Sequence, residues 1–112
     1  MRKYIVGVLV GLFLPALAYP ASMKLVWTDT STREDGFKIE RSLAATGPFS
    51  EIVSVGPNVQ LYIDPNLAEG IQYFYRMRSF NEGGSSTYTP IISATTLVLP
   101  PSVPTGFSAT PQ

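Results

Sequence analysis

Carboxylates are the residues of this sequence with the widest chemical use, and three of them fall in one polar loop. Asp29, Glu34 and Asp35 lie between two apolar segments. Carboxylate oxygens are the ligands that a hard cation such as Ca²⁺ prefers, but these three lack the spacing of a calcium loop. Acidic residues in loops more often form turns or are simply solvated, and no pair of acids stands out as a glycosidase acid and base. We therefore expect no metal site here.

Two residue types with a broad catalytic range are absent, because the 112 residues include no His and no Cys. Thiol nucleophiles, Ser–His relays and metal sites built on imidazole or thiolate are thereby excluded. The eight basic and eight acidic residues give a formal net charge of zero, which provides no attractive field for nucleic acid. The composition predicts a protein that is not an enzyme, needs no cofactor and binds no nucleic acid.

A second group of charged side chains is expected on one face of each of two strands. Lys38 and Glu40 alternate with apolar residues, and Arg76 and Arg78 do so on a longer segment, with Phe74 beside them. An outward aromatic ring next to cations can stack on a sugar or on a partner's ring, so these five residues are a candidate contact surface. The alternative is an ordinary solvated face, whose cross-strand pairs contribute roughly 0.2–1 kcal/mol each.

The alternation of apolar and polar residues places these side chains on strands. Ten Pro, nine Gly and 12% aromatic residues favour a turn-rich all-β protein. The pattern predicts strands at residues 24–28, 37–41, 49–55, 59–64, 72–80 and 88–96. Pro90 has no amide hydrogen, so the last of them is expected at a sheet edge or with a bulge. The fold class that follows is an antiparallel β-sandwich.

The N-terminal segment, residues 1–18, has the layout of a secretory signal peptide. Arg2 and Lys3 form a positively charged start, residues 5–14 are apolar, and Ala16-Leu17-Ala18 fits the small-x-small rule for cleavage. The apolar run is too short to span a bilayer, which needs about 20 residues; a core helix is the other interpretation. We expect a mildly acidic mature chain with no membrane span, located in the periplasm, at the cell surface or outside the cell.

Five short motifs follow one another in the rest of the chain. They lie at residues 25–29, 34–42, 62–64, 67–78 and 81–85, and they include Trp27, the run Glu34-Asp35-Gly36-Phe37, and the pattern Leu67-x-x-Gly70-x-x-Tyr73-x-Tyr75. Each motif is weak alone. In this order and spacing, they resemble a fibronectin type III domain of the bacterial secreted type.

The resemblance implies an immunoglobulin-like β-sandwich over residues 19–98, in which the strand of Lys38 and Glu40 pairs with the strand of Arg76 and Arg78. Trp27 would fill its centre, and Tyr73 would form a tyrosine corner, with its hydroxyl bonded to backbone near Leu67. Gly70 would take a backbone angle that a Cβ resists. The residues that would carry stability rather than function are Trp27, Phe37, Ile39, Leu67, Gly70, Tyr73 and Tyr75.

The sequence departs from the family pattern at both ends of this domain. Only residues 19–22 separate the expected leader from Met23, so the sandwich is expected without its first strand. The Pro-rich tail, residues 99–112, resembles a linker followed by the first strand of another domain. Val103, Phe107 and Ala109 are the tail residues that such a strand would bury.

Two functions remain open from the sequence. One is a non-catalytic exported module for spacing, adhesion or weak binding, whose partner is a protein or polysaccharide at the cell exterior. The other is a self-assembling structural subunit, in which residues 101–112 donate the missing strand to a neighbour, giving a filament, or to their own domain.

Overall fold

The computed structural model describes residues 20–112, and these form seven β-strands. The strands are β1 (Ala21–Val26), β2 (Gly36–Ser42), β3 (Ser50–Val55), β4 (Leu61–Leu67), β5 (Gln72–Asn81), β6 (Gly84–Ser85) and β7 (Ile92–Thr95). No helix within this range is long and apolar enough to cross a membrane. The expected signal peptide lies outside the described residues.

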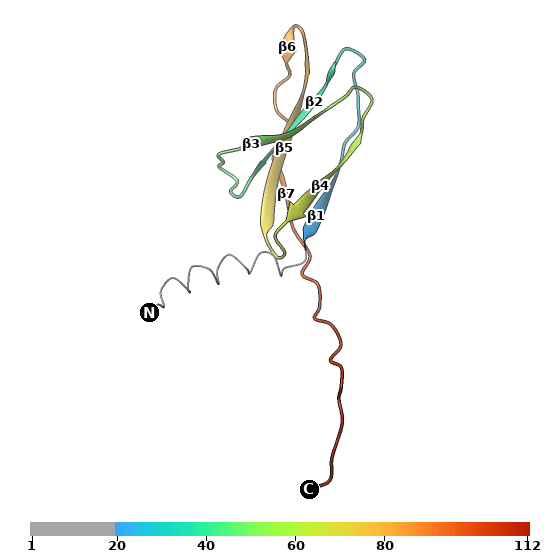
Figure 1. The fold of residues 1–112 in the computed structure, drawn as a ribbon. Helices are drawn as coiled ribbons and strands as arrows, with labels where there is room; N and C mark the ends of the chain where they lie inside the picture. Colours follow the sequence, from blue (N-terminus) through green and yellow to red (C-terminus); the bar gives the residue numbers. More distant parts are fainter. Residues whose placement is uncertain (1–19) are drawn as a thin grey trace, which may run out of the picture.

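The strands form two antiparallel sheets. β1 and β4 make the smaller sheet, and the larger one has the order β3-β2-β5-β6, with β7 also paired to β5. Figure 1 shows the smaller sheet lying against one side of the larger one. The all-β sandwich expected from the sequence is thus confirmed.

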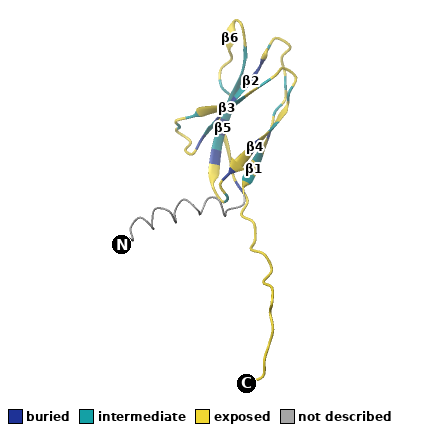
Figure 2. Ribbon diagram, in the orientation of Figure 1, coloured by how far each residue is buried: buried dark blue, intermediate teal, exposed yellow. Residues whose placement is uncertain are grey.

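Apolar side chains from both sheets meet between them. The buried cluster consists of Leu25 on β1, Leu67 on β4, Ile39 on β2, and Tyr73 and Tyr75 on β5. Ile39 is 2% exposed and is the most deeply buried large side chain of the described residues. Dark blue segments in Figure 2 mark these buried positions on the strands. The alternation in the sequence therefore predicted the inner face of the larger sheet correctly.

Trp27 does not fill the centre of the sandwich as expected. It follows the last residue of β1 and is only partly buried, at the margin of the core. Its ring meets Phe37 edge to face, with centroids 5.7 Å apart. Its indole Nε1 is enclosed but has no hydrogen-bond partner within the described chain. The centre belongs to Ile39, because that residue lies in mid-strand on β2, between β3 and β5.

The strand boundaries differ from the expected ones at three places. β1 begins at Ala21 instead of residue 24, and β4 continues to Leu67, beyond the expected end at residue 64. Of the expected strand at residues 88–96, only β7 forms, after Pro90, and the short β6 lies before that range. Thr89 still donates its amide to the carbonyl of Met77 at 2.9 Å, so the chain stays beside β5 up to the proline.

The segment between β4 and β5 is fixed by Tyr73. Its hydroxyl accepts a hydrogen bond from the amide of Ala68 at 3.1 Å, which is the geometry expected of a tyrosine corner. Gly70 has a φ of 68°, in the left-handed region that favours glycine. A Cβ at Gly70 would also approach the Cγ2 of Val98 to 3.0 Å. Both residues therefore serve the fold.

An acidic side chain, Asp64, is buried in this sandwich at 2% exposure. Both of its carboxylate oxygens accept hydrogen bonds from Nη1 of Arg41 at 2.9 Å. The hydroxyl of Tyr75 donates to Oδ2 at 2.7 Å. Burial, followed by this hydrogen bond and the charge of Asp64, raises the pKa of the Tyr75 hydroxyl. The three residues join β4, β2 and β5 across the sandwich.

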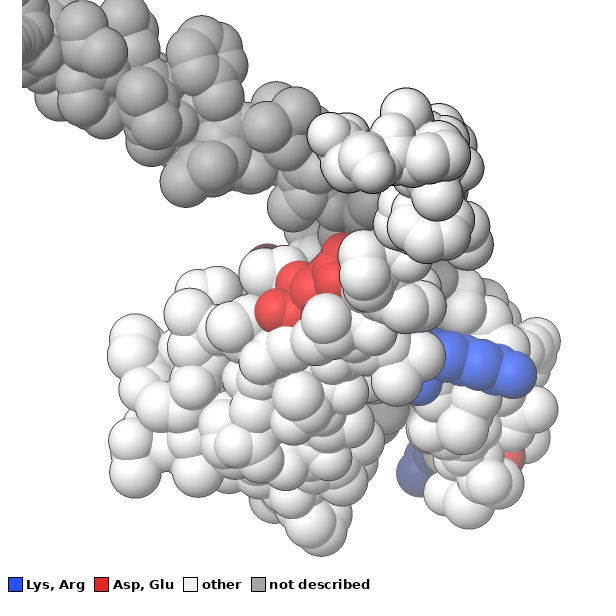
Figure 3. All heavy atoms as spheres, turned by 90° about the horizontal axis from the view of Figure 1, so that it is seen from below, with Lys and Arg blue, Asp and Glu red and all other residues white. Residues whose placement is uncertain are grey.

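The tail after β7 leaves the sandwich at the end where β1 begins (Figure 1). Residues 97–112 belong to no strand and are exposed throughout. The tail therefore does not complete its own sandwich in this structure. Viewed from this end, the molecule shows few charged atoms (Figure 3).

Candidate functional site

The charged residues singled out in the sequence lie together on the outer face of the larger sheet. Between β2 and β5, Lys38 lies opposite Arg78, and Glu40 lies opposite Arg76. Arg76 donates from Nε to Oε1 of Glu40 at 2.8 Å. Phe74, one step further along β5, is partly buried and lies opposite Ser42 of β2 and Ser93 of β7.

Aromatic rings hold the cations of this face in place. The guanidinium carbon of Arg76 lies 4.5 Å from the ring centre of Phe49 and 3.8 Å from that of Tyr88. The guanidinium of Arg78 lies 4.5 Å from the ring centre of Tyr88. Such contacts contribute on the order of 0.5–1 kcal/mol each at exposed sites. We call the set Lys38, Glu40, Phe49, Phe74, Arg76, Arg78 and Tyr88 the cation–aromatic face.

Sequence reasoning missed Phe49 and Tyr88 as members of this face. Phe49 precedes β3, and Tyr88 lies between β6 and β7, so neither belongs to the alternating runs that identified the other residues. The only signal in the sequence was their aromatic character next to turns. Their packing against Arg76 depends on how the loops fold over β5.

Glu40 is the acidic centre of the cation–aromatic face. Its side chain accepts hydrogen bonds from Arg76 and, at 2.8 Å, from the Tyr88 hydroxyl. Burial by itself raises the pKa of a carboxyl group, but these two bonds and the charges of Arg76 and Arg78 outweigh it. The pKa of Glu40 therefore lies below its usual value. The bond to Glu40 is the main reason that the pKa of Tyr88 is raised.

This lowered pKa predicts a pH dependence of stability. A carboxyl group whose pKa is lower in the folded state stabilises the fold above its unfolded pKa, and the contribution is lost as the pH falls through the folded pKa. Glu40→Gln removes the contribution at neutral pH. We therefore expect the difference in melting temperature between the wild-type chain and Glu40→Gln to shrink from about pH 7 to about pH 3.

Thermal melting followed by circular dichroism measures this difference. Glu82→Gln, at an exposed position between β5 and β6, is the matched control and should melt close to the wild-type chain at every pH. A gap between the wild-type and Glu40→Gln melting temperatures that stays constant with pH would contradict the assignment.

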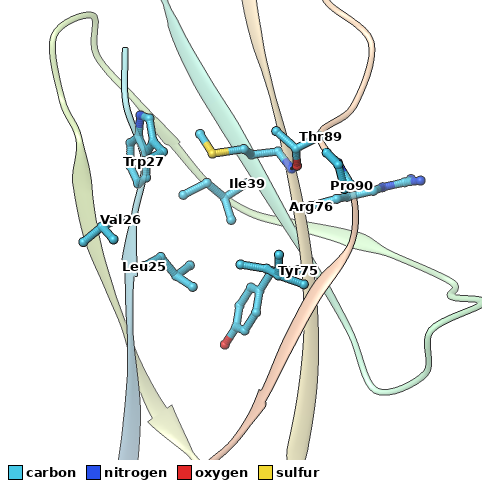
Figure 4. Close-up of a pocket in the computed structure, with 10 residues that line it drawn as sticks. Leu25, Val26, Trp27, Ile39, Tyr75, Arg76, Thr89 and Pro90 are labelled. Carbon is cyan, nitrogen blue, oxygen red and sulfur yellow. The ribbon is translucent and has the colours of Figure 1, made fainter. Parts of the chain in front are cut away.

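A second feature is an apolar groove at the side of the sandwich, between β1 and the segment that leads into β7. Its volume is about 240 Å³, and its lining includes Leu25, Trp27, Ile39, Tyr75, Met77 and Ile92. In Figure 4, Leu25, Ile39 and Tyr75 project into the space between the strands, whereas Val26 points away from it. We call this feature the open groove. It is suited to an apolar side chain.

The polar loop singled out for its carboxylates folds on itself. Asp29 accepts a hydrogen bond from the amide of Ser31 at 3.1 Å, and Ser31 accepts one from the amide of Arg33 at 3.1 Å. Nowhere in residues 20–112 do three or more acidic side chains gather as a metal ion requires. The loop is accounted for by turn formation.

No family model matches the sequence. The amylopullulanase of Thermoanaerobacter thermohydrosulfuricus is 29% identical over 65 residues, which are 58% of this chain and 4% of that protein. Among solved structures, the fn3 domain of human collagen alpha-1(XX) is 24% identical, with a TM-score of 0.56 over 80% of this chain and 82% of that one. The described chain has the fibronectin type III fold.

A second type III neighbour agrees with this assignment. The twitchin kinase region of C. elegans, which includes an Fn3 domain, is 18% identical with a TM-score of 0.54, over 83% of this chain and 18% of that one. The cation–aromatic face lies on the larger sheet of the type III fold, and the open groove lies beside the smaller one.

Proposed function

We propose that the protein is a non-catalytic exported type III module, of the bacterial secreted type, that weakly binds a polysaccharide or protein at the cell exterior. The binding surface is the cation–aromatic face. The observation that carries this proposal is the stacking of Arg76 and Arg78 on Tyr88, at 3.8 and 4.5 Å. Stacking fixes the guanidinium groups before a partner arrives, which lowers the entropy lost on binding.

Arg78 is the cation of this face best placed to meet a partner. Arg76 is occupied by its ion pair with Glu40, whereas Arg78 makes no ion pair within residues 20–112. Its guanidinium donors can bind the hydroxyl groups of a sugar or the carboxylate groups of a protein. One relative is named an amylopullulanase, and this name supports a polysaccharide as the partner. The match covers only a short part of that much longer protein. Export rests on the expected signal peptide.

Retardation of the chain in native gels containing pullulan or soluble starch tests the polysaccharide partner. We expect the wild-type chain to be retarded, and Arg78→Ala to weaken binding by roughly tenfold, as for loss of a guanidinium that stacks and donates hydrogen bonds. Arg33→Ala removes the same side chain from an exposed loop and should leave retardation unchanged.

Equal retardation of Arg78→Ala and the wild-type chain would remove the cation–aromatic face from the proposal. Free migration of the wild-type chain in both gels would rule out these two polysaccharides. The module would then bind a protein or act as a spacer.

A further inference from the structure

The backbone of β1 is open on one side. β4 is its only neighbour among residues 20–112. The amide of Trp27 donates to the carbonyl of Gln60 at 3.2 Å and so points toward β4. Backbone groups of a strand point alternately to its two sides, so the N–H and C=O groups of Lys24 and Val26 point away from β4. No strand within residues 20–112 pairs with these groups on that side, so they are available to an added strand.

The open groove lies directly beside this free edge. Leu25, which alternates with Lys24 and Val26, lines it, and so does Ile92 of β7, which is 58% exposed. An added strand paired with β1 would therefore place every second side chain in the groove. The site combines a row of backbone partners with an apolar space of about 240 Å³.

The tail has the composition of such a strand. Val103 is 83% and Phe107 is 97% exposed, although both are apolar. Phe107 and Ala109 alternate with Ser108 and Thr110, so one face of a strand here is apolar and the other polar. The tail from residue 97 to residue 112 carries no charged residue, so its burial leaves no charge unpaired.

The direction of the tail favours a neighbouring molecule over the tail's own groove. The tail leaves the sandwich beside the start of β1 and runs away from it (Figure 1). To enter its own groove it would have to turn back within a stretch that contains Pro100, Pro101 and Pro104, and Pro-rich segments are extended and stiff. A second copy placed ahead of the tail can receive it without such a turn.

We propose that residues 103–110 of one molecule add to the free edge of β1 in a second copy and place Phe107 in its open groove. Because the donor and the acceptor are different surfaces, the contact repeats head to tail and gives an open filament. This inference goes beyond the proposed function, and it uses neither the cation–aromatic face nor a polysaccharide.

Complementation between two variants of the exported chain, freed of its leader, tests the proposal. Phe107→Asp has a disabled tail and an intact groove, whereas Ile92→Asp has an intact tail and a disabled groove. In light scattering we expect the wild-type chain to form oligomers whose mean mass rises with concentration. Each variant alone should associate at least about 30-fold more weakly. Mixed, the two variants should form a heterodimer that does not grow further. Ser108→Asp adds the same charge on the polar face and should assemble like the wild-type chain.

Hydrogen exchange identifies the surface that is used. The amides of Lys24 and Val26 in Phe107→Asp should exchange rapidly alone and become protected when Ile92→Asp is added. If Ile92→Asp proves unfolded by circular dichroism, Val26→Pro replaces it, because proline removes a free-edge donor at a side chain that points out of the groove. A monomeric wild-type chain at up to about 1 mM overturns the proposal. So does a mixture that stays monomeric, or a dimer in which these two amides exchange as before.

Discussion

Asp64→Ala is expected to lower the free energy of unfolding by about 3 kcal/mol, the lower end of the cost of removing one partner from a buried ion pair. For a domain of this size, that is a fall in melting temperature of roughly 12–24 °C. The cost arises from the groups left behind. Tyr75 loses the acceptor of its buried hydroxyl, and Arg41 loses both of its hydrogen bonds to the carboxylate. Arg41 keeps 31% of its side-chain surface exposed, so water takes over part of its solvation and limits the loss.

Chemical denaturation of purified variants measures this effect. Glu51→Ala removes a carboxylate from an exposed position of β3 and should change the free energy of unfolding by less than about 0.5 kcal/mol. Tyr75→Phe removes only the hydroxyl, and a double-mutant cycle with Asp64→Ala gives the part of the loss that belongs to this bond. Equal stabilities of Asp64→Ala and Glu51→Ala would show that the buried pair adds nothing.

The alternation along each strand was enough to predict which side chains of β2 and β5 face the core. Ile39 and Tyr75 each fall on the apolar face of an alternating run, and both are buried. Lys38 and Glu40 share the opposite face, and they lie across from Arg78 and Arg76 in the strand pairing that the resemblance implied. Period-two patterns carry this information because they fix which side chains share a face.

What the sequence did not show depends on contacts between strands that are distant along the chain. Asp64 lies 23 residues from Arg41 and 11 from Tyr75, so their meeting depends on how the two sheets stack. The Asp64 position looked like the polar end of a strand. Trp27 was expected at the centre because the type III resemblance implied it, but β1 ends before it and leaves the ring at the margin. Local patterns do not encode these placements.

Ile39→Ala should lower the free energy of unfolding by about 3–4 kcal/mol, within the range for large-to-small changes in a core. Ile39 is 2% exposed and packs in the cluster formed by Leu25, Tyr73 and Tyr75. It also forms part of the lining of the open groove, so its truncation extends an existing space of about 240 Å³ into the core. The β-strands on both sides of β2 fix the backbone, and the neighbours therefore cannot move in to fill the gap.

Ile63→Ala is the matched control, because it deletes the same atoms from a residue of β4 that is 44% exposed. It should cost less than about 1 kcal/mol, since much of its side chain is already in water. Denaturation curves of both variants with an unchanged slope would show that only the native packing differs. If Ile39→Ala cost no more than Ile63→Ala, the centre of the core would lie elsewhere.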